Sequence, residues 1–120
     1  MKKVYYAHSK RIFGTEREKL ELQQIKWQFI GYKIINPSEL PLTGAEADKM
    51  KTCFNIIGNM DVIVFSEYKG HVGRGVYDEI TIGEEEGCEI QLLRNNKFKK
   101  GVKLQIVDRT DWKVNYAKVA

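Results

Sequence analysis

Apolar residues follow two different spacings along this chain, and the two spacings alternate. Short runs rich in β-branched and aromatic residues have the length and composition of β-strands. They cover residues 4–7, 32–35, 61–66, 89–93 and 102–107. Between these runs, apolar residues recur three and four positions apart, as in amphipathic helices. The helical stretches lie between Thr15 and Gly31, over residues 44–59 and over residues 74–86.

The ends of the predicted helices carry residues that commonly start or stop a helix. Thr15 is an expected N-cap, and Glu18 three positions later completes a capping-box pattern. Gly31 and Gly87 follow the first and third helices, where a glycine often ends a helix. Residues 111–120 have weak strand or hairpin character, and the pattern does not decide between the two.

The alternation of strands and helices predicts a single α/β domain over residues 1–120. Right-handed crossovers favour a doubly wound, mainly parallel five-stranded sheet of flavodoxin-like order 2-1-3-4-5. In that order the switch point lies between strands one and three. Because ligands bind at such points, we expect a crevice formed by the loop after Tyr6, the loop after Phe65 and the start of the third helix.

Composition and charge narrow the class of protein. An apolar content of 42% with 30% charged residues is typical of a soluble globular domain. No apolar run reaches membrane-spanning length and no signal-peptide pattern is found, so we expect a cytoplasmic protein without membrane contact. The net charge is +4, but the basic residues are scattered, which argues against a nucleic-acid polymer as partner. Cys53 and Cys88 lack metal-ligand spacing and are expected to be reduced core thiols, so no metal is expected.

One carboxylate in the third predicted helix lies near this crevice. Val76 and Ile80 lie on the stripe that faces the sheet, and Glu79 lies about sixty degrees from Val76 by helical periodicity. Glu79 is therefore expected to be half-buried at the edge of the crevice, whereas Asp78 should point away into solvent. The structural alternative for Glu79 is a carboxylate favoured by the positive end of the helix dipole.

The loop after the first strand carries polar and basic side chains, namely His8, Ser9, Lys10 and Arg11. Hydroxyl and cationic groups suit a phosphate, and histidine often transfers protons near neutral pH. The alternative is a solvated loop. Tyr5 lies near the end of the preceding strand, where its hydroxyl is a candidate hydrogen-bond donor to the crevice carboxylate.

Ser66, Gly73 and Gly75 complete the set of expected ligand contacts. Ser66 ends the third strand, and the two glycines allow the backbone to approach a planar ligand. The segment has neither the Rossmann glycine pattern nor a P-loop. We therefore expect no dinucleotide, nucleoside triphosphate or other cofactor.

Five segments in order resemble the nucleoside 2-deoxyribosyltransferase-like family, which includes deoxynucleoside monophosphate N-glycosidases. They are residues 3–9, 13–18, 34–38, 60–65 and 73–83, and the resemblance as a whole covers about residues 3–93, roughly three-quarters of the chain. The resemblance implies a flavodoxin-like fold, a nucleophile at Glu79 that attacks C1′ of a deoxyribosyl group, and a tyrosine at Tyr5 that positions it. Gly75 matches a glycine of the family motif. The resemblance also implies oligomers whose active sites borrow residues from a neighbouring subunit.

The chain departs from the family pattern at two positions. Gly73 lies where the full transferases carry an acid, six residues before the nucleophile, and Glu85 replaces a usual alanine. Without that acid, protonation of a departing base needs another donor. His8, Asp61 and Glu67 are the candidates.

Three functions remain open from the sequence. The first is N-glycosidic cleavage or deoxyribosyl transfer on small molecules, namely deoxynucleosides or their monophosphates. The second is a non-catalytic nucleotide-binding module or sensor that uses the same crevice. The third is a protein-interaction domain that uses an apolar stripe of Leu20 and Trp27, which also suits a homo-oligomer contact. The sequence indicates neither the base preference nor whether the sugar is phosphorylated.

Overall fold

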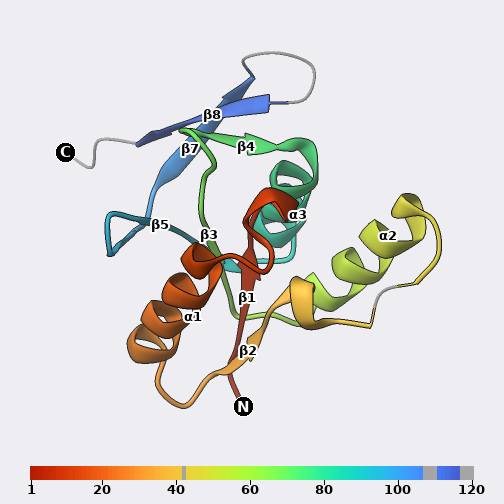
Figure 1. The fold of residues 1–120 in the computed structure, drawn as a ribbon, viewed down its shortest axis with the longest axis horizontal. Helices are drawn as coiled ribbons and strands as arrows, with labels where there is room; N and C mark the ends of the chain where they lie inside the picture. The colour runs from red at the N-terminus through yellow and green to blue at the C-terminus, as the bar shows by residue number, and fades with distance from the viewer. Residues whose placement is uncertain (42, 107–110, 117–120) are drawn as a thin grey trace.

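Five strands form the central sheet of the computed structural model, which describes residues 1–41, 43–106 and 111–116. They are β1 (Lys3–Ala7), β2 (Lys33–Ile35), β3 (Val62–Phe65), β5 (Glu89–Arg94) and β6 (Lys97–Lys99). Their order is β2-β1-β3-β5-β6 (Figure 1). The first four pair in parallel, whereas β6 runs antiparallel to β5. The predicted mainly parallel α/β sheet, in which β1 lies between β2 and β3, is confirmed.

The fifth position of the sheet differs from the prediction. The sequence predicts a strand over residues 102–107 at this position. Residues 102–106 do form a strand, but it belongs to another sheet, so the predicted placement is wrong. Asn95 and Asn96 adopt positive φ angles of 50° and 63°, a two-residue conformation that reverses the chain tightly. The chain therefore folds back as β6, which occupies the edge position itself. Residue 107 lies outside the described residues.

Three strands form a second, antiparallel sheet in the order β4-β8-β7. They are β4 (His71–Gly73), β8 (Asp111–Tyr116) and β7 (Val102–Ile106). In Figure 1 this sheet lies at the top, beyond the end toward which β1 runs. Val72, Leu104 and Val114 pack from it against the core of the central sheet. The strand character expected within residues 111–120 is confirmed up to residue 116, and residues 117–120 lie outside the described part.

Three α-helices cover the two faces of the central sheet. They are α1 (Glu16–Gln28), α2 (Glu46–Ile57) and α3 (Arg74–Glu85), accompanied by the short 3-10 turns η1 (Lys10–Ile12) and η2 (Pro37–Glu39). Thr15 caps α1 as predicted, because its hydroxyl oxygen accepts a hydrogen bond from the backbone N–H of Glu18 at 3.3 Å. The Glu18 carboxylate accepts from the backbone N–H of Gly14 rather than of Thr15, so only half of the capping box forms. None of the helices in the described part of the chain is long and apolar enough to cross a membrane.

Alternation along β1 divides the core into two layers. Val4 and Tyr6 pack on one face with Ile25 of α1 and with Phe29, which follows the last residue of that helix. Tyr5 packs on the other face with residues from α2, α3 and the second sheet. Both faces of β1 are therefore covered, which explains why its run of buried residues is continuous.

The outer face of α1 leaves large apolar side chains in solvent. Leu20 is 49% exposed and Trp27 is 78% exposed. Ile30, just beyond the end of the helix, is exposed as well. A subunit or partner contact through Leu20 and Trp27 stays a prediction.

Gly83 marks a close approach between α3 and the central sheet. A Cβ at this position would lie 2.1 Å from Cδ1 of Ile63 and 3.3 Å from Cδ1 of Ile90. Ile63 is fully buried and has little room to move. We expect Gly83→Ala to lower the free energy of unfolding by about 1–3 kcal/mol, the usual cost of overpacking, despite the better helix propensity of alanine.

Gly58 provides the matched control for this prediction. It ends α2 with right-handed helical backbone angles, and a Cβ there meets only a backbone oxygen, at 3.6 Å. Gly58→Ala should therefore change the free energy of unfolding by less than about 1 kcal/mol. Urea or thermal unfolding measures both variants, and equal midpoints for wild type and Gly83→Ala would contradict the prediction.

Candidate functional site

A cleft of about 1120 Å³ opens at the carboxyl ends of the parallel strands. Its walls come from the loop after β1 with η1, from α2, from the segment between β3 and α3, and from the first turns of α3. Its size suits a ligand as large as a nucleotide. The predicted site residues that line it are His8, Ser9, Lys10, Arg11, Gly73, Gly75 and Glu79.

Glu79 lies in the wall of the cleft and is only 6% exposed. The hydroxyl of Tyr5, itself fully buried, donates a hydrogen bond to Oε2 of Glu79. The predicted hydrogen bond between these side chains is therefore present. It forms because Tyr5 occupies a position of β1 that faces α3, and Glu79 lies in the second turn of that helix.

Burial determines the acid–base character of Glu79. Desolvation raises its pKa, the Tyr5 hydrogen bond lowers it, and the charge of Asp78 raises it, for a pKa of about 7. Burial, and then the adjacent Glu79 carboxylate, raise the pKa of Tyr5 far above its usual range, so the phenol keeps its proton and stays a donor. A carboxyl group that titrates near neutral pH inside a cleft is typical of a functional site.

The η1 turn forms a cationic rim on one side of the cleft. Ser9 caps this turn, since its Oγ accepts a hydrogen bond from the backbone N–H of Arg11 at 3.2 Å. The Lys10 ammonium pairs with the Glu46 carboxylate on α2, and both side chains are well exposed. The Arg11 guanidinium lies over the ring of Tyr68, 5.3 Å from the ring centroid. Two cations and a hydroxyl within three consecutive residues suit an anionic group.

His8 lies in the same loop, but its imidazole is buried and fully engaged. Nδ1 lies 3.0 Å from the Tyr6 carbonyl oxygen, and Nε2 lies 2.6 Å from a carboxylate oxygen of Glu18. The imidazole also stacks on the ring of Tyr6, with 3.7 Å between centroids. Burial raises the pKa of Glu18, but hydrogen bonds, chiefly from His8, outweigh it and hold that pKa below its usual value. These contacts anchor the loop through the His8 side chain, and a ligand contact of His8 stays a prediction.

Ser66 lies on the wrong side of the sheet for the ligand contact that the sequence predicts. It comes one residue after Phe65, which faces the cleft layer, so it faces the opposite layer together with Val64. Its Oγ donates a hydrogen bond to Oε1 of Glu21 on α1 at 2.8 Å, and the residue is fully buried. Because side chains alternate along the strand, Ser66 lies in the layer opposite the cleft and is not part of the cleft lining.

Asp78 lines the cleft, contrary to the prediction that it faces away. Its carboxylate lies 3.7 Å from Nε of Arg74, one turn earlier on α3. Because the start of α3 reaches the cleft, residues from several faces of the helix contact it, and helical periodicity alone cannot separate them. Gly73 and Gly75 lie in the same wall, and a Cβ at Gly73 would meet nothing within 4 Å, which leaves room for a ligand.

The other proton donors suggested by the sequence lie away from the cleft. Glu67 is buried and held by Arg94, whose Nη2 lies 2.7 Å from Oε2. Asp61 accepts a hydrogen bond from the backbone N–H of Lys3 at 2.7 Å, next to the starts of β1 and β3. Asp61 therefore lies at the opposite end of the sheet from the cleft, and neither Asp61 nor Glu67 is part of the cleft lining.

Two further groups of residues line the cleft, and neither was predicted from the sequence. Met50 and Cys53 contribute from α2, and Tyr68 and His71 contribute from the segment that contains β4. Nδ1 of His71 lies 2.9 Å from the carbonyl oxygen of Lys69, so within the described part of the chain Nε2 remains for a ligand. The α2 residues carry a helical apolar spacing, which indicates only a core face. The β4 strand has three residues, too few for a periodic pattern.

Thiol and metal chemistry have little support in this cleft. Cys53 and Cys88 are buried free cysteines, and burial raises the pKa of both thiols. Among residues 1–41, 43–106 and 111–116, no three His, Cys, Asp or Glu side chains are grouped to hold a metal ion.

Comparison with known proteins supports the fold. No protein-family model matches the sequence, and no curated protein matches it. Among solved structures, the chain is similar to "2-desoxiribosyltransferase from Leishmania mexicana", with 18% sequence identity and a TM-score of 0.57. The match covers 77% of this chain and 63% of that chain, so this chain spans less than two-thirds of that protein's length. At this identity the likeness shows a shared fold, and the reaction has to be argued from the site.

The raised pKa of Glu79 predicts that its ionisation destabilises the folded protein. Its pKa of about 7 exceeds the ordinary value of 4.5, so between these values the folded protein keeps a proton that the unfolded chain has released. The contribution of Glu79 to the free energy of unfolding is therefore greatest below pH 4.5. It decreases as the pH rises from 4.5 and is lost as the pH passes through about 7. Glu79→Gln removes the titration. We therefore expect wild type to lose about 1.4 kcal/mol per pH unit relative to the variant across this window.

Urea unfolding of both proteins at several pH values across this window measures the effect. Glu85→Gln, on the exposed face of the same helix, is the matched control and should follow the wild type throughout. A constant difference between wild type and Glu79→Gln would mean that the carboxyl group does not titrate here, which contradicts the raised pKa.

Proposed function

We propose that the protein cleaves or transfers the N-glycosidic bond of deoxynucleosides or their monophosphates, with Glu79 as the nucleophile. One observation carries the proposal, namely a buried carboxylate, oriented by the buried Tyr5, in the wall of a nucleotide-sized cleft. The fold shared with a deoxyribosyltransferase supports this choice of reaction. A pure binder of anionic nucleotides would gain nothing from a buried carboxylate, which repels them.

In the proposed first step, a carboxylate oxygen of Glu79 attacks C1′ of the sugar. The C1′–O bond forms as the C1′–N bond breaks, and the bonding electron pair stays on the base nitrogen, which takes up a proton. In the second step, water gives hydrolysis or a second nucleobase gives transfer. The incoming atom bonds to C1′ and gives up its proton to the group that protonated the departing base. The bond from C1′ to Glu79 breaks with its electron pair on the glutamate oxygen, which restores the carboxylate.

The burial of Glu79 favours the positive charge that develops at C1′. Little water reaches the carboxylate, so its negative charge acts on the oxocarbenium-like centre with weak screening. Tyr5 holds Oε2, which leaves Oε1 for C1′. With a pKa of about 7, roughly half of the Glu79 side chains are ionised near neutral pH.

Departure of the base requires a proton, and His71 is a histidine of the cleft lining that can supply one from its ring. Its Nδ1 is engaged by the Lys69 carbonyl oxygen, so a protonated ring donates from Nε2. Asp78 also lines the cleft, but Arg74 engages its carboxylate. We assign the proton to His71 for this reason.

A 5′-phosphate, where the substrate carries one, binds the cationic rim in this proposal. Ser9, Lys10 and Arg11 provide a hydroxyl and two cations at the cleft opening. The cations of Arg11 and Lys69 lie 5.3 and 5.5 Å from the ring centroid of Tyr68, so this ring keeps two positive groups near the opening.

A non-catalytic nucleotide sensor that uses the same cleft is the second candidate. The observation in its favour is Gly73, which leaves open space where the resembled transferases carry an acid. The two candidates differ in one measurable property, since a sensor binds a nucleotide without releasing free base.

Glu79→Gln should abolish the release of free base. The amide keeps the shape of the side chain and can accept from Tyr5, but it cannot attack C1′, and the loss of a nucleophile commonly lowers kcat by several orders of magnitude. Chromatography of reactions with each deoxynucleoside and deoxynucleoside monophosphate measures the free base. Glu85→Gln, exposed on the same helix, is the matched control and should keep the wild-type rate.

Two tyrosine variants extend this test to the orienting hydrogen bond. Tyr5→Phe removes the donor to Glu79, whereas Tyr6→Phe removes an equivalent buried donor to Glu21 in the other layer. Both lose a buried hydrogen bond, but we expect only Tyr5→Phe to lower kcat, by about a hundredfold. Base release that persists in Glu79→Gln would assign the nucleophile to another residue. A wild-type protein that releases no base would favour the sensor.

Arg11→Ala should weaken the binding of a deoxynucleoside monophosphate by about 10- to 100-fold and leave nucleoside binding unchanged. A hydrogen bond to a charged group contributes about 1.5–3 kcal/mol, which accounts for this range. Calorimetric titration in the Glu79→Gln background measures both affinities without turnover. Lys19→Ala on the outer face of α1 removes the same charge and serves as the control. If Arg11→Ala loses the same affinity for the nucleoside as for the monophosphate, Arg11 does not contact the phosphate.

A further inference from the structure

Basic residues gather in the last quarter of the chain. Residues 94–120 contain eight lysines and arginines but only two acidic residues, whereas residues 1–93 contain more acidic than basic side chains. The strands β6, β7 and β8 of this region form the edge of the central sheet and most of the second sheet. Strand pairing therefore brings together lysines that occur in small groups along the sequence.

The β5–β6 hairpin presents three of these cations on one face. Arg94 and Lys97 are register partners, and Lys99 lies two residues further along β6 on the same side. Together with Asn95 in the turn between the two strands, these three side chains line a hollow of about 270 Å³. Phe98 faces the other way, where its ring packs edge-on against Phe29 with 5.7 Å between centroids.

The outer face of the second sheet carries further lysines. Val102 and Leu104 pack inward against the core, and Lys103 between them is exposed. Lys113 precedes the buried Val114 on β8 and is exposed as well. This face therefore adds two cations to those of the hairpin.

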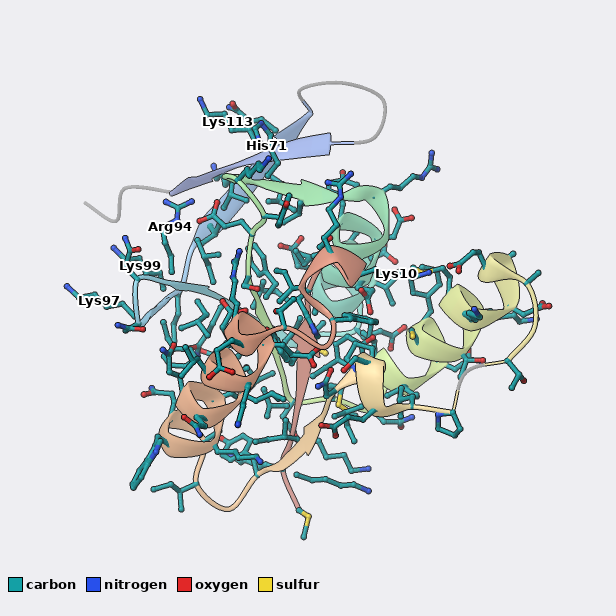
Figure 2. The ribbon with its side chains drawn as sticks, viewed as in Figure 1. Lys10, His71, Arg94, Lys97, Lys99 and Lys113 are labelled. Carbon is teal, nitrogen blue, oxygen red and sulfur yellow. The ribbon has the colours of Figure 1, made fainter. Side chains whose placement is uncertain are left out.

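Figure 2 shows how these groups are arranged. The labelled side chains of Lys113, Arg94, Lys99 and Lys97 follow one side of the molecule from β8 to the β5–β6 turn. We call Lys97, Lys99, Lys103 and Lys113 the basic strip. No ion pair within the described residues involves Lys97, Lys103 or Lys113, whereas several cations around the cleft pair with carboxylates.

We infer that the basic strip binds the phosphate backbone of a single-stranded nucleic acid. A row of cations with few neighbouring carboxylates complements a chain of phosphates, and flexible lysines can follow that chain whatever its sequence. Among the side chains whose exposure the structure describes, the large apolar ones in solvent are Met1, Leu20, Trp27 and Ile30. None of these four lies in the hairpin, in β4, or at residues 102–105, 113 and 114 of the second sheet. A lipid surface or a protein partner would need such apolar anchors beside the charge.

The neighbouring cleft favours a single strand over a duplex. His71 of β4 is the register partner of Lys113 and also lines the cleft, so the strip adjoins the cleft opening. A flexible single strand can offer an unpaired base to such a cleft without the cost of unpairing. This choice of single strand rests on the proposed nucleotide function, whereas the binding of a phosphate chain to the strip does not.

Fluorescence anisotropy with a labelled single-stranded DNA oligonucleotide tests the inference. We expect wild type to bind with a Kd on the order of 10⁻⁵ M at physiological salt. Joint replacement of Lys97, Lys99 and Lys113 by Gln should weaken binding at least about tenfold at low salt. It should also reduce the slope of log K against log salt by about 2, because each contact to a single-strand phosphate contributes about 0.7.

The matched control replaces three exposed lysines on α1 and β2, namely Lys19, Lys26 and Lys33, by Gln. It changes the net charge equally and should change the affinity less than about twofold. Equal weakening by both triple variants would mean that net charge alone drives binding, and it would overturn the inference. Unchanged binding by the strip variant would do the same.

Vesicles that contain phosphatidylserine provide the competing occupant. If the strip variant loses more affinity for the vesicles than for the DNA, the strip binds a lipid surface, and the inference is overturned. The base-release assay tests the glycosidic mechanism, and the anisotropy tests the basic strip, so the failure of one is distinguished from the failure of the other.

Discussion

The hydrogen bond between Tyr5 and Glu79 is the contact on which the geometry of the cleft depends. A carboxyl group that is only 6% exposed needs a donor in the core, and Tyr5 supplies it from an inner strand of the sheet. The bond holds the first half of α3 against β1, and this part of α3 forms one wall of the cleft. The close approach at Gly83 holds the second half of the same helix against the sheet.

Two neighbouring tyrosines of β1 each donate a hydrogen bond to a buried glutamate, and the two pairs lie on opposite faces of the sheet. The difference between the two glutamates explains where a ligand can act. Glu21 on the α1 side accepts from three donors, which include Tyr6 and, at 2.8 Å, Ser66. Within the described residues, Glu79 accepts from Tyr5 alone, and its pKa is raised to about 7. Glu21, which has more hydrogen-bond donors, lies in the closed layer between α1 and the sheet. Glu79, which has fewer, lies in the wall of the cleft.

Periodicity in the sequence is enough to predict the parallel strands and the position of Glu79, because both follow from spacing within one element. Strand alternation also contains the information that places Ser66 in the opposite layer. Asp78 could not be placed in the same way, since several faces of a helix contact a cleft at its end. The hairpin had a local signal in Asn95 and Asn96, two residues that tolerate positive φ. The second sheet had none, because the short β4 pairs with β8, which is distant in the sequence.

Covalent trapping tests the central claim, that the buried Glu79 is a nucleophile, most directly. Fluorine at C2′ of a nucleoside destabilises the oxocarbenium-like centre, so a glycosyl-enzyme formed from an activated analogue breaks down slowly and accumulates. Mass spectrometry of proteolytic peptides should locate the added sugar on Glu79 and find none in Glu79→Gln. Sugar attached to another residue such as Asp78, or free base released in a single turnover without any adduct, would contradict this account.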